Sequence, residues 1–309
     1  MNGQARGTLS QTDLHLHSSV SPDGEISPRG LAELCCQCGV TLAALTDHNS
    51  IAGTEEFIWR SAQLGVRAIS SIELDCTFGD RTLHVLGYGI HIADMTLLHA
   101  LQEVQARQKA VGMRLLDMVE ALGIRFDRER VLDLAGDGAV CAELIAIDAL
   151  SHPENQQHPL LKPLLEGDAL AACTPLQFYQ TLCTPGKPAY VPVEYMTAEQ
   201  AIQLLHDAGG LAVLAHPGAS LSNPTLPDAL MQLPFDGIEA FSSYHTAAQA
   251  AGYAVQAQAR GLLLTGGSDF HGRSKPDIRV GAIDWLGREN EMRVAFLPAV
   301  SDLLHSGRH

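Results

Sequence analysis

The sequence lacks the features that mark membrane, secreted and nucleic-acid-coating proteins. No apolar run approaches the ~20 residues that a bilayer-spanning helix needs, and the opening stretch MNGQARGTLSQTD has no apolar core of a secretory signal. Basic residues are scarce: 20 Lys and Arg against 35 Asp and Glu give a formal net charge of −15. Such a chain has no general cationic surface that could release counterions from nucleic acid. We therefore expect a cytoplasmic protein with no membrane partner and no stable nucleic-acid complex.

Disulfide and zinc-finger frameworks are also missing. The seven cysteines are an odd number and follow no zinc-finger spacing, and Cys35, Cys36 and Cys38 fall in a stretch of helical character. Structural thiols in a reducing compartment fit this pattern best. The hydrophobic content of 46% is ordinary for a globular protein, and the length suits one large domain, with or without an insertion.

Short apolar runs that end in polar residues recur, at residues 42–49, 66–75, 81–90, 209–218, 235–245 and 261–272. Amphipathic, helix-like segments lie between several of them, at residues 28–38, 52–64, 198–208 and 246–260. This alternation predicts an α/β fold of parallel βα units, either a doubly wound sheet or a barrel. Many of the polar residues come at strand ends, where barrel enzymes build their active sites, and this favours a barrel.

Residues 96–189 have a different character. Residues 97–123 have long helical periodicity without a strand signal, whereas residues 151–168 and 173–192 are Pro-rich and loop-like. We interpret 96–189 as a mostly helical insertion or cap. It would divide the barrel into residues 12–95 and 190–300.

The stretch DLHLHSSVSPDGEISP places His15 and His17 two residues apart, followed by Asp23 in a Pro-Asp-Gly turn. Side chains two apart on a strand point to the same side, and imidazoles suit a divalent ion of the first transition row. Alone, the motif fits a polar strand face equally well.

Further potential ligands come at or near the ends of the apolar runs. Glu73 lies within such a run, and buried carboxylates are rare unless they are paired or bind metal. The complete set is His15, His17, Asp23, His48, Glu73, His84, His216, Asp269 and His271. Nine nitrogen and oxygen donors are too many for one tetrahedral zinc site and enough for two or three ions.

The order of these motifs resembles the PHP family, named for polymerase and histidinol phosphatase. The matching elements are His-x-His, the acidic turn, Thr-Asp-His, a glutamate with a histidine eleven residues later, His-Pro-Gly and Asp-x-His. The resemblance implies a distorted (β/α)7-type PHP barrel with a helical insertion. It also implies three manganese-like ions at these nine positions, with Fe²⁺ or Zn²⁺ as alternatives.

The activity implied is hydrolysis of a phosphate ester of a small metabolite or nucleotide, by a hydroxide that bridges the ions. Candidate phosphate contacts are Lys187, Arg273 and Lys275, and Asp13 and Asp47 are candidates to orient imidazoles or to act in catalysis. The sequence does not identify the group that protonates the leaving group. Alternatives are a phosphodiesterase acting on cyclic phosphates or the 5′ end of short RNA, an amide hydrolase, and a non-catalytic metal-binding PHP domain.

One segment departs from the family pattern. Nucleotide-processing relatives carry an Arg-x-His-x-x-Arg-type segment in the insertion, but residues 139–150 here read AVCAELIAIDAL, with Glu143 and without Arg or His. We therefore expect a substrate with one phosphoryl group.

Overall fold

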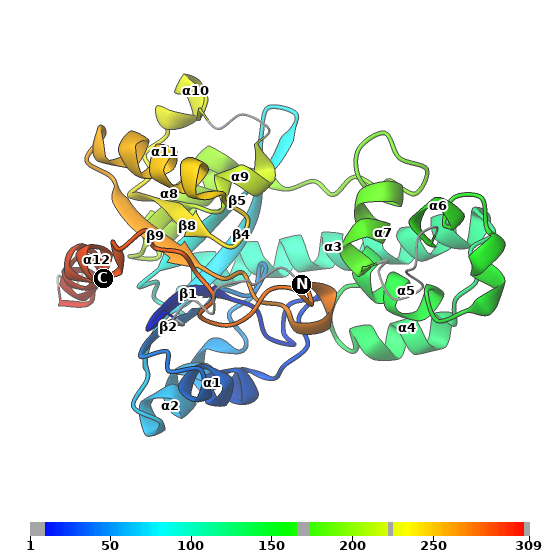
Figure 1. Ribbon diagram of the computed structural model, residues 1–309, viewed down its shortest axis with the longest axis horizontal. Helices are drawn as coiled ribbons and strands as arrows, with labels where there is room; N and C mark the ends of the chain where they lie inside the picture. The colour runs from blue at the N-terminus through cyan, green and yellow to red at the C-terminus, as the bar shows by residue number, and fades with distance from the viewer. Residues whose placement is uncertain (1–9, 166–173, 222–224, 306–309) are drawn as a thin grey trace, which may run out of the picture.

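The strands of the computed structural model form two sheets, which Figure 1 shows on one side of the molecule. The structure describes residues 10–165, 174–221 and 225–305. One sheet is parallel, in the order β1 (Thr12–Leu16), β2 (Leu42–Leu45) and β3 (Arg67–Ile69). The other has the order β6 (Met196–Thr197), β4 (Ser71–Phe78), β5 (Arg81–Tyr88), β7 (Leu211–Leu214), β8 (Gly237–Ser242) and β9 (Leu263–Gly267).

Isolated bridges connect the two sheets at two places. Leu16, at the end of β1, pairs with Phe270 just beyond β9, and His48, beyond β2, pairs with Glu73 in β4. The bridges bring the ends of strands from both sheets together at one site. The predicted α/β class is confirmed.

One expectation about strand direction is wrong. β5 runs antiparallel to both β4 and β7, whereas we predicted parallel units throughout. The cause is a tight turn in which Phe78 pairs with Arg81. Gly79 takes a positive φ of 62° there, which a two-residue hairpin loop requires and glycine adopts freely.

Helices cover the outer faces of the sheets. The predicted amphipathic segments form α1 (Pro28–Gln37), α2 (Thr54–Gln63), α8 (Ala198–Asp207) and α11 (Ala247–Gln258). Shorter elements are α9 (Pro217–Ser220), α10 (Asp228–Met231) and η2 (Gly272–Ser274), and α12 (Glu289–His305) ends the described chain. In Figure 1, α1 and α2 lie beside the small sheet, and α8 and α11 beside the large one.

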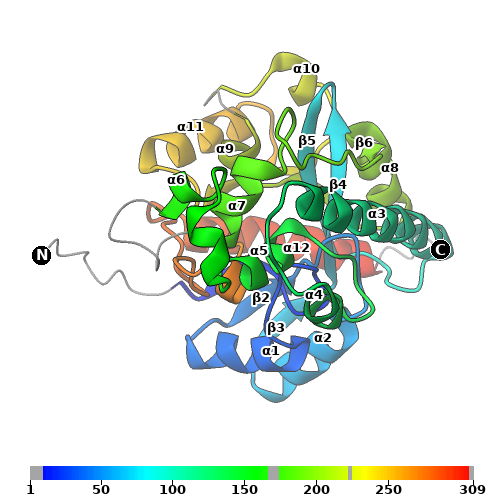
Figure 2. The same ribbon diagram turned by 90° about the vertical axis from the view of Figure 1, so that its right-hand side faces the viewer.

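The segment between β5 and β6 is helical and projects to one side, toward the viewer in Figure 2. It contains α3 (Met95–Ala121), α4 (Arg128–Ala135), α5 (Ala142–Ala149), η1 (Pro153–Gln157), α6 (Lys162–Leu165) and α7 (Pro175–Leu182). Its buried residues, among them Leu116, Ile145 and Phe178, form a hydrophobic cluster of their own. The start of α3 instead packs into the large sheet's cluster through Leu97 and Leu101.

The Pro-rich part of the insertion is more regular than its composition indicates. Residues that we expected to form loops make η1, α6 and α7. α7 begins with a capping box between Thr174 and Gln177, and its proline occupies the first turn, where a missing N–H costs nothing. Residues 166–173 lie outside the described residues. Within the described parts, no helix combines the length and the apolar character needed to cross a bilayer.

Candidate metal centre

The ends of the strands bring the predicted donors into one buried cluster. His15 lies in β1 and His17 directly after it, while His48, His216 and Asp269 follow β2, β7 and β9. Gly267 allows β9 to approach β1, because a Cβ at this position would lie 2.1 Å from the Cβ of His15. All nine predicted donors lie in this part of the structure.

Glu73 is the centre of the cluster. Its Oε1 lies 2.9 Å from His84 Nδ1 and 3.1 Å from His216 Nε2. Its Oε2 lies 3.2, 3.1 and 3.3 Å from ring nitrogens of His15, His17 and His48. Burial alone would raise the pKa of this carboxyl, but the charges of the imidazoles hold the pKa well below its usual range.

Four donor atoms converge on one point. His15 Nε2 and His17 Nε2 are 3.1 Å apart, and Asp269 Oδ1 lies 3.2 Å from the first and 3.0 Å from the second. Glu73 Oε2 lies 3.2 and 3.1 Å from the same two nitrogens. Four nitrogen and oxygen donors this close together are suited to share a cation.

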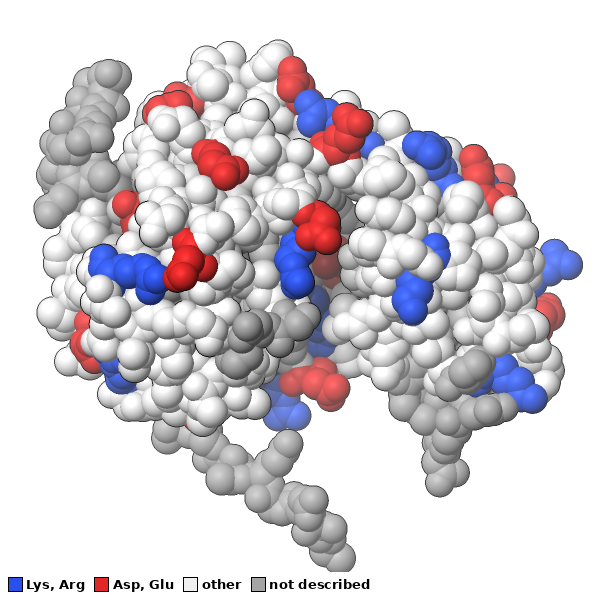
Figure 3. Space-filling model, turned by 90° about the horizontal axis from the view of Figure 1, so that it is seen from above, with Lys and Arg blue, Asp and Glu red and all other residues white. Residues whose placement is uncertain are grey.

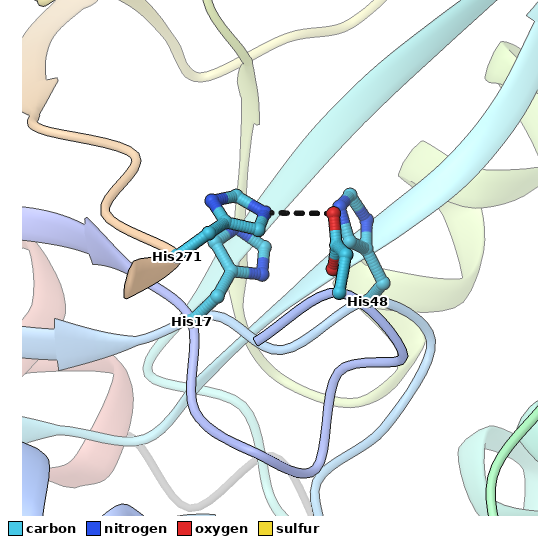
Figure 4. Close-up of side chains that lie close together, drawn as sticks. His17, His48 and His271 are labelled. Carbon is cyan, nitrogen blue, oxygen red and sulfur yellow. Dashed lines mark ion pairs between the residues drawn. The ribbon is translucent and has the colours of Figure 1, made fainter. Parts of the chain in front are cut away.

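Three groups of donors have the spacing of metal ligands. They are His15, Glu73, His216 and Asp269; His17, Asp23, His48 and His271; and His48, Asp75 and His84, with the ligand atoms of each group within 4.8 Å of one another. Figure 4 shows the imidazoles of His17, His48 and His271 side by side. Its dashed line is the 3.1 Å ion pair between His271 and Asp23.

Asp75 is a donor that the sequence reasoning missed. It directly opposes His84 in the β4–β5 ladder, and its Oδ1 lies 3.0 Å from His48 Nδ1. Asn49 and Gln108 donate side-chain hydrogen bonds to its other oxygen. The signal was present, because a residue two positions after Glu73 on a strand faces the same side.

In some of these histidines, the ring nitrogen that points away from the other donors forms a hydrogen bond of its own. His15 Nδ1 donates to Glu239 at 3.0 Å, and His271 Nδ1 donates to the carbonyl oxygen of Asp269 at 2.8 Å. Because a carboxylate and a carbonyl only accept, the neutral form of each ring carries its proton on Nδ1, and its Nε2 can then offer a lone pair to a metal ion. His17 Nδ1 lies 2.9 Å from the hydroxyl of Ser21.

Asp13 and Asp47, which were predicted to orient imidazoles or to act in catalysis, accept hydrogen bonds from other groups in the structure. Asp13 accepts backbone hydrogen bonds from Ser268 and Gly281, and burial raises its pKa to about 6. Asp47 accepts from the backbone and the hydroxyl of Ser18. Both carboxylates hold loops beside the cluster. Their closeness to His15 and His48 in the sequence suggested a contact with those rings, but their oxygens accept from these other donors.

The three cations predicted to contact phosphate have different environments. The side chain of Lys275 is half-buried, and its Nζ lies 2.7 Å from Asp269 Oδ2. Arg273 is 70% exposed and pairs with Glu25, and Lys187 is exposed in the loop after α7. Tyr244, which sequence reasoning missed, donates its hydroxyl to the same Asp269 oxygen at 2.5 Å. Lys275 is therefore the predicted cation that lies within the cluster.

Tyr244 and Lys275 also line a cavity of about 200 Å³ between the strand ends and the insertion. Leu176 at the start of α7 and Ile278 form other parts of its wall. Seen from above, the surface is hollowed between these two parts of the molecule (Figure 3). Basic and acidic side chains are interspersed on that face.

Glu143 reaches this region from the insertion. It lies in the first turn of α5, and the thiol of the preceding Cys141 donates to the carbonyl of Pro22, beside Asp23. Burial raises the pKa of Glu143 to about 7, the charge of Asp23 adds to the rise, and the charge of Lys275 opposes it. Glu143 is therefore a half-buried residue whose charge interacts with those of Asp23 and Lys275.

The donor set fits divalent metal ions. Within the described chain, some buried atoms have no hydrogen-bond partner, and five of them belong to residues of the cluster: Asp23 Oδ1, Glu73 Oε2, His216 Nδ1, Asp269 Oδ1 and His271 Nε2. Unsatisfied buried polar atoms are costly, and atoms grouped in this way are explained by a shared cation. The pKa of His48 is raised to about 10, because carboxylate charges outweigh the effect of burial. The cluster therefore attracts positive charge.

Comparison with known proteins gives consistent matches. Residues 13–159 match the model of the PHP domain. The chain is 32% identical to phosphoribosyl 1,2-cyclic phosphate 1,2-diphosphodiesterase of Eggerthella lenta, over 84% of this chain and 94% of that protein. It is 29% identical to 3′,5′-nucleoside bisphosphate phosphatase of Chromobacterium violaceum, over 88% and 91%. A solved amidohydrolase from Chromobacterium violaceum, with bound sulfate, has a TM-score of 0.77 and 26% identity over 94% of this chain and 97% of that one.

Proposed function

The chain belongs to the PHP domain family, and from that premise we propose that it is a metal-dependent phosphoesterase acting on a small metabolite or nucleotide. The observation that carries this proposal is the convergence of His15, His17, Glu73 and Asp269 on one point. Hydrolysis of phosphate esters is the activity named for both curated relatives.

We assign the metal ligands to the nine predicted donors and to Asp75, in the three groups described above. All are nitrogen and oxygen donors, which suit manganese, iron or zinc, and we propose Mn²⁺ as the native ion. Bound divalent ions supply a nucleophilic water at neutral pH and neutralise phosphoryl oxygens. Glu73, whose two oxygens face five imidazoles, would be a ligand at the centre of the cluster.

Residues of the chain itself position the substrate. Lys275 brings a half-buried positive charge beside Asp269 and contributes to an anion site. Lys275 and Tyr244 line the same side of the 200 Å³ cavity, and we propose that the leaving group of the substrate binds there. The cavity is at or below the small end of ligand pockets, so it favours a compact substrate over a polymer. The net charge of −15 favours the same conclusion.

The metal content is the first testable consequence. Protein purified after manganese supplementation should contain two or three transition-metal ions per chain, because the cluster contains three groups of donors with the spacing of metal ligands. Elemental analysis against protein concentration measures this number. One ion or none per chain would contradict the assignment.

A substrate panel tests the activity. The manganese-loaded protein should hydrolyse at least one phosphomonoester in a panel of sugar phosphates, nucleotides, nucleoside bisphosphates, cyclic phosphates and short 5′-phosphorylated RNA. Turnover limited to cyclic phosphates or RNA would establish a phosphodiesterase instead. A fully loaded protein without activity on any ester or amide would support a non-catalytic PHP domain.

A further inference from the structure

Glu239 connects two segments that carry proposed metal ligands. It lies in β8, is fully buried, and is separated from His15 by 224 residues along the chain. Oε1 accepts from His15 Nδ1 at 3.0 Å, and Oε2 accepts from the backbone N–H of His216 at 2.7 Å. The β8–β9 ladder shifts register between Glu239 and Phe241, an irregularity of the kind that redirects side chains.

We infer that Glu239 is a positioning residue that sets the metal affinity of the group formed by His15, Glu73, His216 and Asp269. It holds the His15 ring with Nδ1 protonated, so that the lone pair of Nε2 faces the other donors. It also fixes the backbone at the start of the His-Pro-Gly turn, from which the His216 side chain projects. This inference rests on the proposed function only in taking the cluster to bind metal.

The chemistry of the two contacts explains why a carboxylate is needed. Both partners are donors, and a carboxylate can accept from each with a separate oxygen. Glutamine has the same shape but one acceptor oxygen. In Glu239→Gln one partner must face the amide NH₂ group. If that partner is His15, its ring must accept at Nδ1, which places the proton on Nε2, where the metal should bind.

Calorimetric titration of metal-free protein with Mn²⁺ tests the inference. Loss of a carboxylate that orients a ligating histidine typically weakens metal binding by about 10–100-fold. We expect Glu239→Gln to bind at least one ion about 10–100-fold more weakly than the wild type, or to lose it. The rise in melting temperature on adding Mn²⁺ should shrink accordingly, because a ligand stabilises the folded state in proportion to its binding.

Asp148→Asn is the matched control. Asp148 is also a buried carboxylate that pairs with a histidine, His152, and accepts a backbone hydrogen bond, from Asp127, but it lies in the insertion. This variant should melt at a lower temperature without metal and show an unchanged metal affinity and metal-induced rise. A purely structural role of Glu239 would give the same pattern in Glu239→Gln.

The outcomes separate this inference from the proposed function. Equal metal stoichiometry and affinity in Glu239→Gln and wild type, within about threefold, would overturn the inference, and so would a wild-type protein that binds no metal. Weakened binding in Glu239→Gln supports it even if the wild type hydrolyses no phosphate ester. That combination would contradict the proposed phosphoesterase activity alone.

Discussion

Replacing Asp269 with Asn should reduce phosphoesterase activity by more than about a hundredfold while the protein still folds. Asp269 Oδ1 lies 3.0–3.2 Å from His15 and His17, and its other oxygen holds Tyr244 and Lys275. The substitution removes a charge that the proposed ions need, and loss of a direct ligand should exceed the 10–100-fold cost of losing an outer partner. His17→Ala, which removes another donor, should have a similar effect.

Asparagine is the suitable replacement because of the backbone. Asp269 has a φ of 58°, in the left-handed region that Asp and Asn tolerate better than other side chains. An alanine there would combine loss of the ligand with backbone strain. The Asn variant therefore separates the chemistry from folding more cleanly.

The measurement is turnover of the best substrate of the panel, together with a thermal melt. Asp236→Asn serves as the control, because Asp236 lies just before β8 and pairs with His206 and with the backbone N–H of Ala212 near the start of β7, at the opposite end of these strands from His216. It should lower the melting temperature slightly and leave turnover near the wild-type value. Turnover near wild type in both Asp269→Asn and His17→Ala would contradict the metal assignment.

The metal donors that could be predicted from the sequence are those whose spacing along the chain already shows that their side chains point the same way. His15 and His17, like Asp269 and His271, stand two apart at a strand end, and this spacing alone implies a shared direction. Asp75 follows the same rule relative to Glu73. It was overlooked although the rule would have found it.

Hydrogen-bond partners that lie far apart in the sequence could not be predicted from local spacing. Glu239 meets His15 across 224 residues, and Tyr244 meets Asp269 across 25. Conversely, Asp13 and Asp47 are neighbours of ligands in the sequence but bind backbone amides or Ser18 in the fold. Glu239 did carry one signal, the same as that of Glu73: a carboxylate inside an apolar strand.

The positions of helices and strands could be predicted, because each type of element has its own spacing of hydrophobic residues along the sequence. The antiparallel direction of β5 was not, because it depends on a two-residue turn at Gly79 that leaves no room for a crossover. In the insertion, proline content suggested loops, but Pro175 occupies the first turn of α7, where proline is favoured. Composition was misleading there because proline's effect depends on its position in a helix.

Glu143 should make the protein discriminate against a second phosphate. It is half-buried in the first turn of α5, and its carboxyl interacts with the charges of Asp23 and Lys275, beside the proposed substrate site. A cation at this position could form a charge-assisted hydrogen bond to phosphate, worth roughly 1.5–3 kcal/mol. A carboxylate instead repels the phosphate or accepts from a hydroxyl of the substrate. We therefore expect kcat/KM for nucleoside 3′,5′-bisphosphates to be lower than for the best monophosphate.

Glu143→Gln tests the origin of this discrimination. The substitution keeps the shape of the side chain and removes its charge, so kcat/KM for the bisphosphate relative to the monophosphate should rise about tenfold, which corresponds to about 1.4 kcal/mol. Glu129→Gln is the matched control: Glu129 is in the first turn of α4, in the same insertion, but is exposed. Its substitution should leave the ratio unchanged. A wild-type protein that prefers the bisphosphate by tenfold or more, or a ratio that Glu143→Gln does not alter, would show that another residue determines the choice of substrate.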